Sequence, residues 1–319
     1  MSLDRIRLAS LHDKVISAEE ASAFIEDGMT VGMSGFTRAG EAKAVPLALV
    51  KRAHTNPLKI TLITGASLGN DLDKQLTEAG VLARRLPFQV DNTLRKAINN
   101  GEVMFIDQHL SETVEQMRNL QLKKPDVAII EAVAITEDGG IIPTTSVGNS
   151  ASFAIFAEKV IVEINTNLSP AFEGLHDIYI PTYRPTRQPI PLTQVDERIG
   201  THAINIDPAK IVGIVINNDL HDSPSTVTAP DDETQGIADH LIAFFEKEVA
   251  EERLPKNLGP LQAGIGSIAN AVLTGLKDSN FEDLVMYSEV LQDCTFELID
   301  AGKMKFASGS SITLSAKYG

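Results

Sequence analysis

Short runs of apolar residues alternate along the chain with segments of helical periodicity. The runs that predict buried strands in the first two thirds of the chain are 30–33, 59–64, 103–106, 126–132, 159–165 and 210–216. Between them, Ser17–Glu20 reads as a capping box, Pro46 stands early in a second helical pattern, and Asp91 and Ser111 can each cap a further helix. The order strand, helix, strand predicts a parallel α/β architecture.

One of these runs carries a charge in an otherwise apolar context. Asp126–Ala132 is apolar apart from Glu131 and predicts a central strand that is covered on both faces. A carboxylate there must be paired, hydrogen-bonded or at the end of the strand. We expect a structural role for Glu131, with the positioning of a nearby turn as the alternative.

The pattern changes after the last of these strands. Asn217–Asp232 is rich in Asn, Asp, Ser, Thr and Pro, and is the best candidate for a domain boundary. We therefore predict two α/β domains, residues 1–220 and 221–319. Residues 168–200 form a proline-rich stretch without periodicity, in which Arg184 and Arg187 either meet an anion or are solvated surface charges.

The candidate chemistry lies in the second domain. An apolar run ends at Gly264-Ile-Gly266, a helical pattern follows from about Ile268 to Leu276, and the next strand, Leu284–Tyr287, leads to Glu289. Glycines allow backbone to approach a ligand closely, and a helix start presents free N–H groups. Ligands bind beyond the carboxyl ends of strands in open α/β sheets, so a carboxylate here suits a nucleophile. The alternative is a solvated Glu289 beside glycines that only shape a turn.

The order of elements around this site recurs in the first domain. Gly32-Met-Ser-Gly-Phe36, a helix and a strand that ends at Ser67 mirror Gly264–Ile268, a helix and the strand that ends at Glu289. We expect two related α/β domains that face each other, each of which contributes one turn and one strand end. From Thr234 onward only about three strands are predicted.

Composition restricts the partners. The net charge of −15 argues against nucleic acid and anionic membranes, which require clustered positive charge. The single cysteine, Cys294, excludes an internal disulfide and is expected to be a small buried residue. No signal-peptide pattern and no apolar run of membrane-spanning length occur, so we expect a cytoplasmic protein.

Several of these motifs together resemble the acetyl-CoA hydrolase/transferase family, and in particular the class I CoA-transferases that act on succinate, acetate or propionate. The resemblance runs from about residue 5 to the end of the chain. The segments that carry it are 32–36, 107–111, 125–131, 144–149, 264–270, 288–293 and 307–313.

The resemblance implies a fold of two open α/β domains and a ping-pong transfer of CoA between an acyl-CoA and a small carboxylate. In such enzymes the glutamate that corresponds to Glu289 forms a glutamyl-CoA thioester. The loop that corresponds to Gly264, Ile265, Gly266, Ser267 and Ile268 contacts CoA. CoA is then a substrate, and neither a permanently bound cofactor nor a metal is expected.

The first domain also contains candidate site residues. The resemblance makes Ser34 and Ser67 candidates for the acyl or carboxylate pocket, with the shaping of turns as the alternative. Thr144–Ser146 and Asn149 either touch substrate or cap the helix that follows. Where such enzymes often carry an arginine for the acceptor carboxylate, this chain has His221, which either replaces it or signals a different acid.

Family members extend well beyond residue 319, so the second domain is expected to be incomplete. A homo-oligomer, most simply a dimer, or a complementing C-terminal fragment is the expected partner. The alternatives to a CoA-transferase are an acyl-CoA hydrolase, a non-catalytic CoA-binding or interaction module and, with less support, a sugar-phosphate isomerase of related fold.

Overall fold

The structure is a computed structural model that describes residues 3–225 and 230–317. Its contacts divide the chain into two compact units. Unit 1 comprises Met1–Ile190 and Ile199–Ser223, and unit 2 comprises Pro191–Arg198 and Pro224–Gly319. The chain therefore passes from unit 1 to unit 2 for the last time between Ser223 and Pro224, within the predicted boundary segment.

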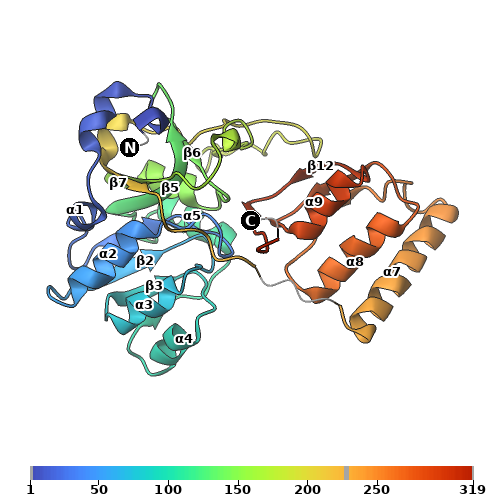
Figure 1. Cartoon of the computed structure of the whole chain (residues 1–319), viewed down its shortest axis with the longest axis horizontal. Coiled ribbons are helices and arrows are strands. Elements are labelled where there is room, and N and C mark those ends of the chain that lie inside the picture. The colour runs from blue at the N-terminus through green and yellow to red at the C-terminus, as the bar shows by residue number, and fades with distance from the viewer. Residues whose placement is uncertain (1–2, 226–229, 318–319) are drawn as a thin grey trace. The chain divides into compact units, whose positions relative to one another are not determined.

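Unit 1 is built on a twisted sheet of eight strands (Figure 1). The strands are β1 (Thr30–Met33), β2 (Ile60–Ile63), β3 (Leu82–Leu86), β4 (Met104–Phe105), β5 (Val127–Ile135), β6 (Ile141–Pro143), β7 (Lys159–Asn165) and β8 (Ile211–Asn217). Their order is β4-β3-β2-β1-β5-β7-β8, all parallel, with β6 paired antiparallel to β5. The order reverses between β1 and β5, and such a switch point is where open α/β sheets bind ligands.

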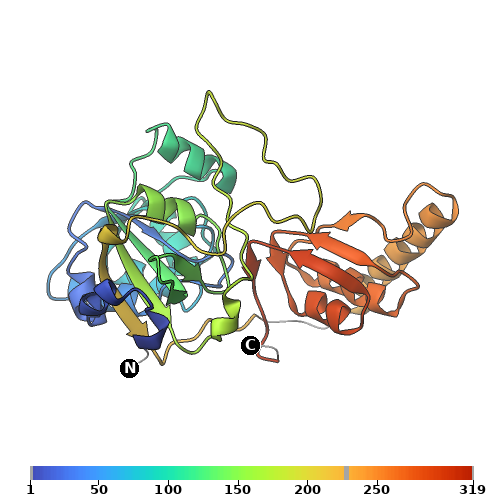
Figure 2. The ribbon, with the colours of Figure 1, turned by 90° about the horizontal axis from the view of Figure 1, so that it is seen from above.

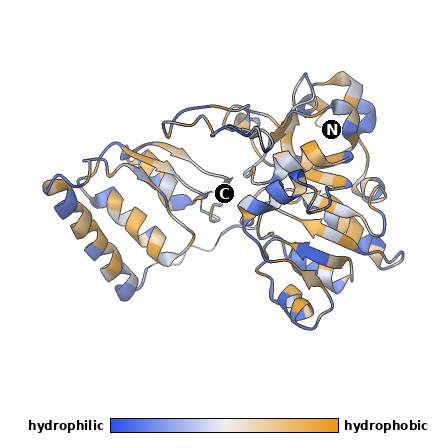
Figure 3. Cartoon of the chain, turned by 180° about the vertical axis from the view of Figure 1, so that it is seen from behind, coloured by the Kyte–Doolittle hydropathy of each residue, from blue (hydrophilic) through white to orange (hydrophobic). Residues whose placement is uncertain are grey.

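Six helices cover this sheet. They are α1 (Ala18–Ser22), α2 (Ala44–Ala53), α3 (Leu72–Glu78), α4 (Asn92–Asn99), α5 (Leu110–Arg118) and α6 (Ser150–Phe156), with short 3₁₀ turns at 3–5, 9–14, 170–172 and 208–210. One apolar cluster packs helices α1 to α4 against one face of the sheet, which includes Val127 and Ile129. A second cluster packs α6 against the other face, which includes Ala128 and Ile130. β5 is buried along its whole length, which confirms the predicted central strand. Figure 3 shows the hydrophobic colour concentrated on these central strands.

Local sequence signals explain some of the helix starts. The capping box at Ser17 is present, and Asp91 caps α4 by accepting from the Leu94 N–H at 2.8 Å. The expectation for Ser111 is wrong, because α5 begins at Leu110 and His109 precedes it without a side-chain cap. Ser111 has the better capping side chain, but the helix starts one residue before it, at Leu110.

Unit 2 contains a smaller parallel sheet, with the order β12-β10-β9, and a separate pair, β11 with β13. The strands are β9 (Pro260–Leu261), β10 (Leu284–Tyr287), β11 (Val290–Leu291), β12 (Met304–Ser308) and β13 (Ser311–Ile312). Three helices, α7 (Asp232–Ala250), α8 (Ser267–Asp278) and α9 (Asp293–Asp300), lie side by side on the sheet (Figure 2). An apolar cluster that includes Leu276, Leu284 and Leu298 fills the space between them. The prediction of about three strands missed β11 and β12.

Candidate active site

The glycine loop of unit 2 and the end of β10 lie against each other. The Ser288 hydroxyl donates to the Ala263 carbonyl at 2.8 Å, and the Ala263 N–H lies 3.2 Å from the same hydroxyl. Four residues after Ser288, the Gln292 side-chain amide donates to the Gly264 carbonyl at 3.4 Å. Because these contacts flank Glu289 on both sides in the sequence, they hold its backbone beside the Gly264–Ile268 loop.

The Glu289 side chain is exposed within unit 2. Its own carbonyl accepts from the Ser310 N–H at 2.8 Å, so its backbone is tied to the segment between β12 and β13. Among the described residues, its carboxylate has no hydrogen-bond or ion-pair partner. A carboxylate that is fixed at its backbone and free at its oxygens is accessible for attack on an electrophile.

The loop itself offers backbone donors. Gly266 has φ of +151°, a conformation that side chains rarely adopt, and it precedes α8 without a side-chain cap. The first N–H groups of a helix lack intrahelical partners, and they carry the positive end of the helix dipole. Ile265 and Ile268 are 60% and 49% exposed, so the loop presents apolar surface next to these donors. Donors for an anion beside an apolar surface suit a ligand that has both features.

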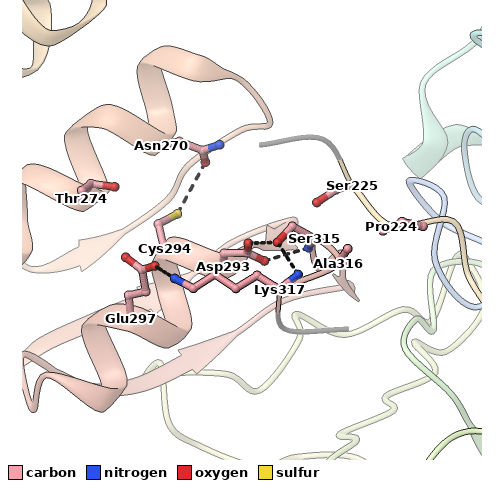
Figure 4. A pocket seen from close by; sticks show the side chains of 10 residues that line it. All are labelled: Pro224, Ser225, Asn270, Thr274, Asp293, Cys294, Glu297, Ser315, Ala316 and Lys317. Carbon is pink, nitrogen blue, oxygen red and sulfur yellow. Dashed lines mark hydrogen bonds and ion pairs between the residues drawn. The ribbon is translucent and has the colours of Figure 1, made fainter. Parts of the chain in front are cut away.

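A hollow of about 560 Å³ lies between α8 and α9 and the 315–317 segment in unit 2 (Figure 4). Its lining residues are Pro224, Ser225, Asn270, Thr274, Asp293, Cys294, Glu297, Ser315, Ala316 and Lys317. Asp293 accepts from the Ser315 N–H at 2.9 Å and from the Ser315 hydroxyl, and Lys317 donates to Glu297 at 3.1 Å. These contacts fasten the 315–317 segment to α9, so the charged groups of the hollow already have protein partners.

Cys294 also lines this hollow. It is 6% exposed, and its thiol lies 3.5 Å from the Asn270 side-chain oxygen. Burial raises the pKa of the thiol to about 11. The expectation of a small buried cysteine is confirmed, and at neutral pH the thiol stays protonated and unreactive.

Unit 1 holds a second polar centre, which is buried between the loop that follows β1 and the neighbouring strands β5 and β7. The Lys43 ammonium donates to Glu131 at 2.6 Å, pairs with Asp222 at 2.6 Å and donates to the Glu41 carbonyl at 2.7 Å. Burial lowers the pKa of Lys43, but the carboxylates of Glu131 and Asp222 outweigh it and the net shift is upward. The ammonium therefore stays charged, with its three donors satisfied.

Glu131 is the buried carboxylate that the sequence marked as needing partners. It accepts from Lys43, from Asn165 at 2.9 Å and from the Thr144 hydroxyl at 2.6 Å. Burial is the main reason that its pKa is raised to about 8, and Lys43 opposes the shift. These contacts give Glu131 the structural role that we expected.

Glu163 occupies the same level of the neighbouring strand β7. Its carboxylate accepts from the N–H groups of Lys43, Ala44 and Val45 at 2.8, 2.9 and 3.1 Å. These groups begin α2, so a side chain distant in sequence caps this helix and meets the positive end of its dipole. Burial raises the pKa of Glu163, and the three backbone donors oppose the rise.

Glu41 completes the centre. One of its oxygens accepts from the Asn70 amide at 2.9 Å, while the other is buried without a partner. Burial, together with the charge of Asp222, raises the pKa of Glu41 to about 7. Glu41 thus exchanges a proton near neutral pH, inside the protein.

The other residues that the sequence singled out in unit 1 have identified contacts. The Ser34 hydroxyl accepts from the Glu131 N–H at 2.9 Å, and both Ser34 and Ser67 are buried. Thr145 donates to Asp222 at 2.8 Å and Ser146 donates to the Ala39 carbonyl at 2.8 Å, so neither caps α6. Asn149 precedes α6 but makes no side-chain cap. The role of Ser34 and Ser67 in an acyl pocket stays a prediction.

The arginines of the irregular stretch meet a carboxylate of the protein itself. Arg187 and Arg184 lie 3.1 and 3.6 Å from the Glu115 carboxylate. His221 is exposed, and its carbonyl accepts from the Asn70 amide at 3.1 Å. Its role towards an acceptor acid also stays a prediction.

Sequence reasoning missed four members of the buried centre, Glu41, Lys43, Glu163 and Asp222. A signal existed for Glu163, which interrupts an apolar run as Glu131 does in the neighbouring strand. No comparable signal exists for Lys43 and Asp222, which lie in polar or small-residue loops. Only the fold brings these loops together.

The two α/β units, and the exposed carboxylate beside a loop with N–H donors in unit 2, agree with the resemblance seen in the sequence. Residues 2–216 match the acetyl-CoA hydrolase/transferase N-terminal domain. The chain therefore belongs to the acetyl-CoA hydrolase/transferase family, as the sequence motifs implied.

Two curated relatives illustrate the similarity. The succinyl-CoA:acetate CoA-transferase of Clostridium kluyveri is 46% identical over 311 residues, which cover 97% of this chain and 58% of that enzyme. The acetyl-CoA hydrolase of Kluyveromyces lactis is 44% identical over 322 residues, which cover 98% of this chain and 61% of that enzyme. The chain thus spans about three fifths of the length of these relatives.

Solved structures support the fold. RipA from Yersinia pestis matches with a TM-score of 0.67 at 18% identity, covering 96% of this chain and 69% of that one. A 4-hydroxybutyrate CoA-transferase from Porphyromonas gingivalis matches with a TM-score of 0.61 at 18% identity, covering 97% and 64%. The predicted α/β fold of CoA-transferase type is confirmed.

No helix within residues 3–225 and 230–317 has both the length and the apolarity to cross a membrane. Over the same part of the chain, no group of three or more His, Cys, Asp or Glu residues could hold a metal ion.

Proposed function

We propose that this chain carries the nucleophile and the CoA-binding loop of a CoA-transferase. The Glu289 carboxylate attacks the thioester carbonyl of an acyl-CoA, which gives an acyl–glutamyl anhydride and CoA thiolate. The thiolate then attacks the glutamyl carbonyl, which releases the first carboxylate and forms a glutamyl-CoA thioester. An acceptor carboxylate repeats these steps in reverse, so no atom or electron is left over.

The observation that carries the proposal is the free carboxylate of Glu289 beside an uncapped helix start. An attacking oxygen must not be engaged elsewhere, and the tetrahedral intermediates carry an oxyanion that N–H donors stabilise. Gly264–Ile268 supplies donors from α8 and apolar surface from Ile265 and Ile268. A ligand with phosphates and an extended pantetheine arm has chemistry for both. The names of the relatives agree with this reading, because they act on succinyl-CoA or acetyl-CoA.

The proposal is tested by trapping the intermediate. Acyl-CoA is added to the purified chain without acceptor, and hydroxylamine or borohydride is then used to convert the thioester to a stable product. Mass spectrometry should place the mass change on Glu289. Glu289→Gln should abolish it, while Glu246→Gln, a change at another exposed glutamate on α7, should leave it intact. A label at any other residue contradicts the proposal.

Two further candidates follow from specific observations. Several relatives are acetyl-CoA hydrolases, so water can be the acceptor; CoA release without added carboxylate selects that reading. The other candidate is a non-catalytic CoA-binding or interaction module, for which the exposed Ile265 and Ile268 of the loop would provide apolar contact surface. Calorimetric CoA binding without acyl exchange selects this second reading.

The partners of the chain follow from the same proposal. Its ligands are acyl-CoA and small carboxylates, in acetate or propionate metabolism of the cytoplasm, and its protein partner is a second copy or a complementing C-terminal fragment. Sedimentation of the purified chain distinguishes a dimer from a monomer. Recovery of exchange on addition of the corresponding C-terminal part of a relative would identify the fragment as the partner.

A further inference from the structure

The stretch from Asn217 to Ser223 leads the chain out of unit 1, and it is unusually well fastened there. Asp222 pairs with the Lys43 ammonium at 2.6 Å, and its other oxygen accepts from the Gly40 N–H at 3.2 Å and the Thr145 hydroxyl at 2.8 Å. Ser223 exchanges two hydrogen bonds of 3.0 Å with Asn70. The stretch is therefore joined to the loops that follow β1, β2 and β6.

The Lys43 ammonium connects the exit stretch to unit 1, and the loss of one of its partners is costly. Its side chain is 1% exposed, and the loss of one carboxylate from a buried pair leaves an uncompensated charge. Asp222, by contrast, is the most exposed group of the centre, with 22% of its side chain accessible. Since Glu131 sits on a central strand, Asp222 is the partner that can leave.

Glu41 is placed to influence Asp222. It lies on the same loop as Lys43 and shares Asn70 with the exit stretch, because the Asn70 amide donates both to Glu41 and to the His221 carbonyl. An ionised Glu41 meets the charge of Asp222, and its second oxygen has no donor among the described residues. A neutral Glu41 avoids both penalties.

We propose that residues 217–223 form a latch that holds the exit from unit 1 through the Asp222–Lys43 pair, and that protonation of Glu41 keeps this latch closed. The charged groups that face Glu41 are Asp222 from the exit stretch and Lys43 from its own loop. Glu131 of β5 accepts from the Lys43 ammonium, and Glu163 of β7 accepts from the Lys43 backbone N–H. When Glu41 ionises, release of Asp222 to solvent relieves the repulsion between the two carboxylates. Opening frees up to six residues, 218–223, which follow the last residue of β8, to lengthen the link into unit 2.

The direction of the pH effect follows from the pKa of about 7 for Glu41 in the closed latch. In the open latch Asp222 no longer raises that pKa, so opening is coupled to loss of the proton. Opening is therefore rare below about pH 6 and increases as the pH rises through the closed-state pKa. Each unit by which the two pKa values differ changes the opening constant about tenfold.

Amide hydrogen exchange of the whole chain tests the latch. The Gly40 and Asn70 amides donate directly to Asp222 and Ser223, so they report its opening. The Ala44 and Val45 amides donate to Glu163, so they report the integrity of unit 1. After correction for the intrinsic exchange rate, protection of Gly40 and Asn70 should fall about tenfold between about pH 6 and about pH 9, while Ala44 and Val45 remain protected.

Two variants decide the cause. Glu41→Gln imitates the protonated acid, so the Gly40 and Asn70 amides should stay protected at both pH values. Asp222→Asn removes the ion pair and the repulsion together, so protection should be low and independent of pH. Constant protection in the wild type, or an unchanged pH effect in Glu41→Gln, overturns the proposal. Should Glu41→Gln unfold, Ala44 and Val45 would reveal it, and the wild-type pH series together with Asp222→Asn still gives the answer.

Discussion

The two units use carboxylates in opposite ways. In unit 1, Glu131 and Glu163 are fully buried and every oxygen has a donor, so their hydrogen bonds join strands, loops and a helix start. In unit 2, Glu289 is exposed and its oxygens have no partner in the described part of the chain. A satisfied carboxylate stabilises a structure, whereas a free one can react. The difference separates residues that shape this protein from the residue that we expect to act.

The largest effect is expected at Glu289. Substitution by Gln should reduce acyl exchange by about 10⁴-fold or more, because the attacking oxygen is lost. The same change should alter the free energy of unfolding by less than about 0.5 kcal/mol, as it touches no structural contact. Steady-state acyl exchange and denaturant unfolding of Glu289→Gln test the expected loss of activity and the expected unchanged stability. Equal activity of Glu289→Gln and wild type would end the proposed role.

The converse is expected at Lys43. Replacement by Met leaves Glu131 and Asp222 without their cation and should destabilise unit 1 by about 3–5 kcal/mol. Native-state hydrogen exchange should show the loss in β5, while β10 in unit 2 keeps its protection. An equal loss in both units would mean that they unfold together, and no loss would contradict the contribution of the buried pair.

Stability should depend on pH through the buried acids. The pKa of Glu41 is raised to about 7 and that of Glu131 to about 8, whereas an unfolded glutamate titrates near 4.5. Between these values the folded state holds more protons, so the free energy of unfolding falls as the pH rises from about 4.5 to about 8 and then levels. The total fall is on the order of a few kcal/mol.

Glu41→Gln provides the control for this titration. In this variant the free energy of unfolding should fall less as the pH rises to about 7, and the decrease caused by Glu131 should remain. Urea unfolding at a series of pH values measures both. An unaltered pH profile in Glu41→Gln would show that Glu41 does not titrate in this range.

A smaller effect is expected in the ligand-binding loop. Gly266→Ala forces a side chain into φ of +151°, which costs on the order of 1–3 kcal/mol and shifts the loop. CoA binding measured by calorimetry should weaken about tenfold or more. Gly302→Ala, at a positive φ in the turn before β12 and with free space around it, serves as the matched control and should leave CoA binding unchanged.

The smallest effect concerns a local signal. Asp91→Ala removes the cap of α4 and should lower the free energy of unfolding of unit 1 by about 1 kcal/mol, without a change in acyl exchange. Thermal unfolding and the exchange assay test this. Loss of activity in this variant would show that the two kinds of carboxylate are less separate than we infer.

Much of the fold could be predicted because its signals are local. The apolar runs placed β1, β7 and β10 at their observed bounds, and the caps at Ser17 and Asp91 mark helix starts that the structure reproduces. The cap predicted at Ser111 failed, since a residue's capping preference does not decide where tertiary contacts begin a helix. β11 was missed because two residues carry too little periodicity, whereas β12 was missed although it is one residue longer than β10.

The sequence by itself determined the family, the α/β class and the candidate loop and carboxylate, because motifs and hydrophobic periodicity are written in neighbouring residues. It also marked Glu131 as a charge that needed partners. Only the tertiary structure decided which residues meet there: Lys43 donates to Glu131 and pairs with Asp222, and these residues come from loops far apart in the chain that meet because parallel strands end at the same edge of the sheet. The proton on Glu41 has the same origin, since a pKa depends on which charges lie nearby and how much water is excluded, and the chain does not specify either until it folds.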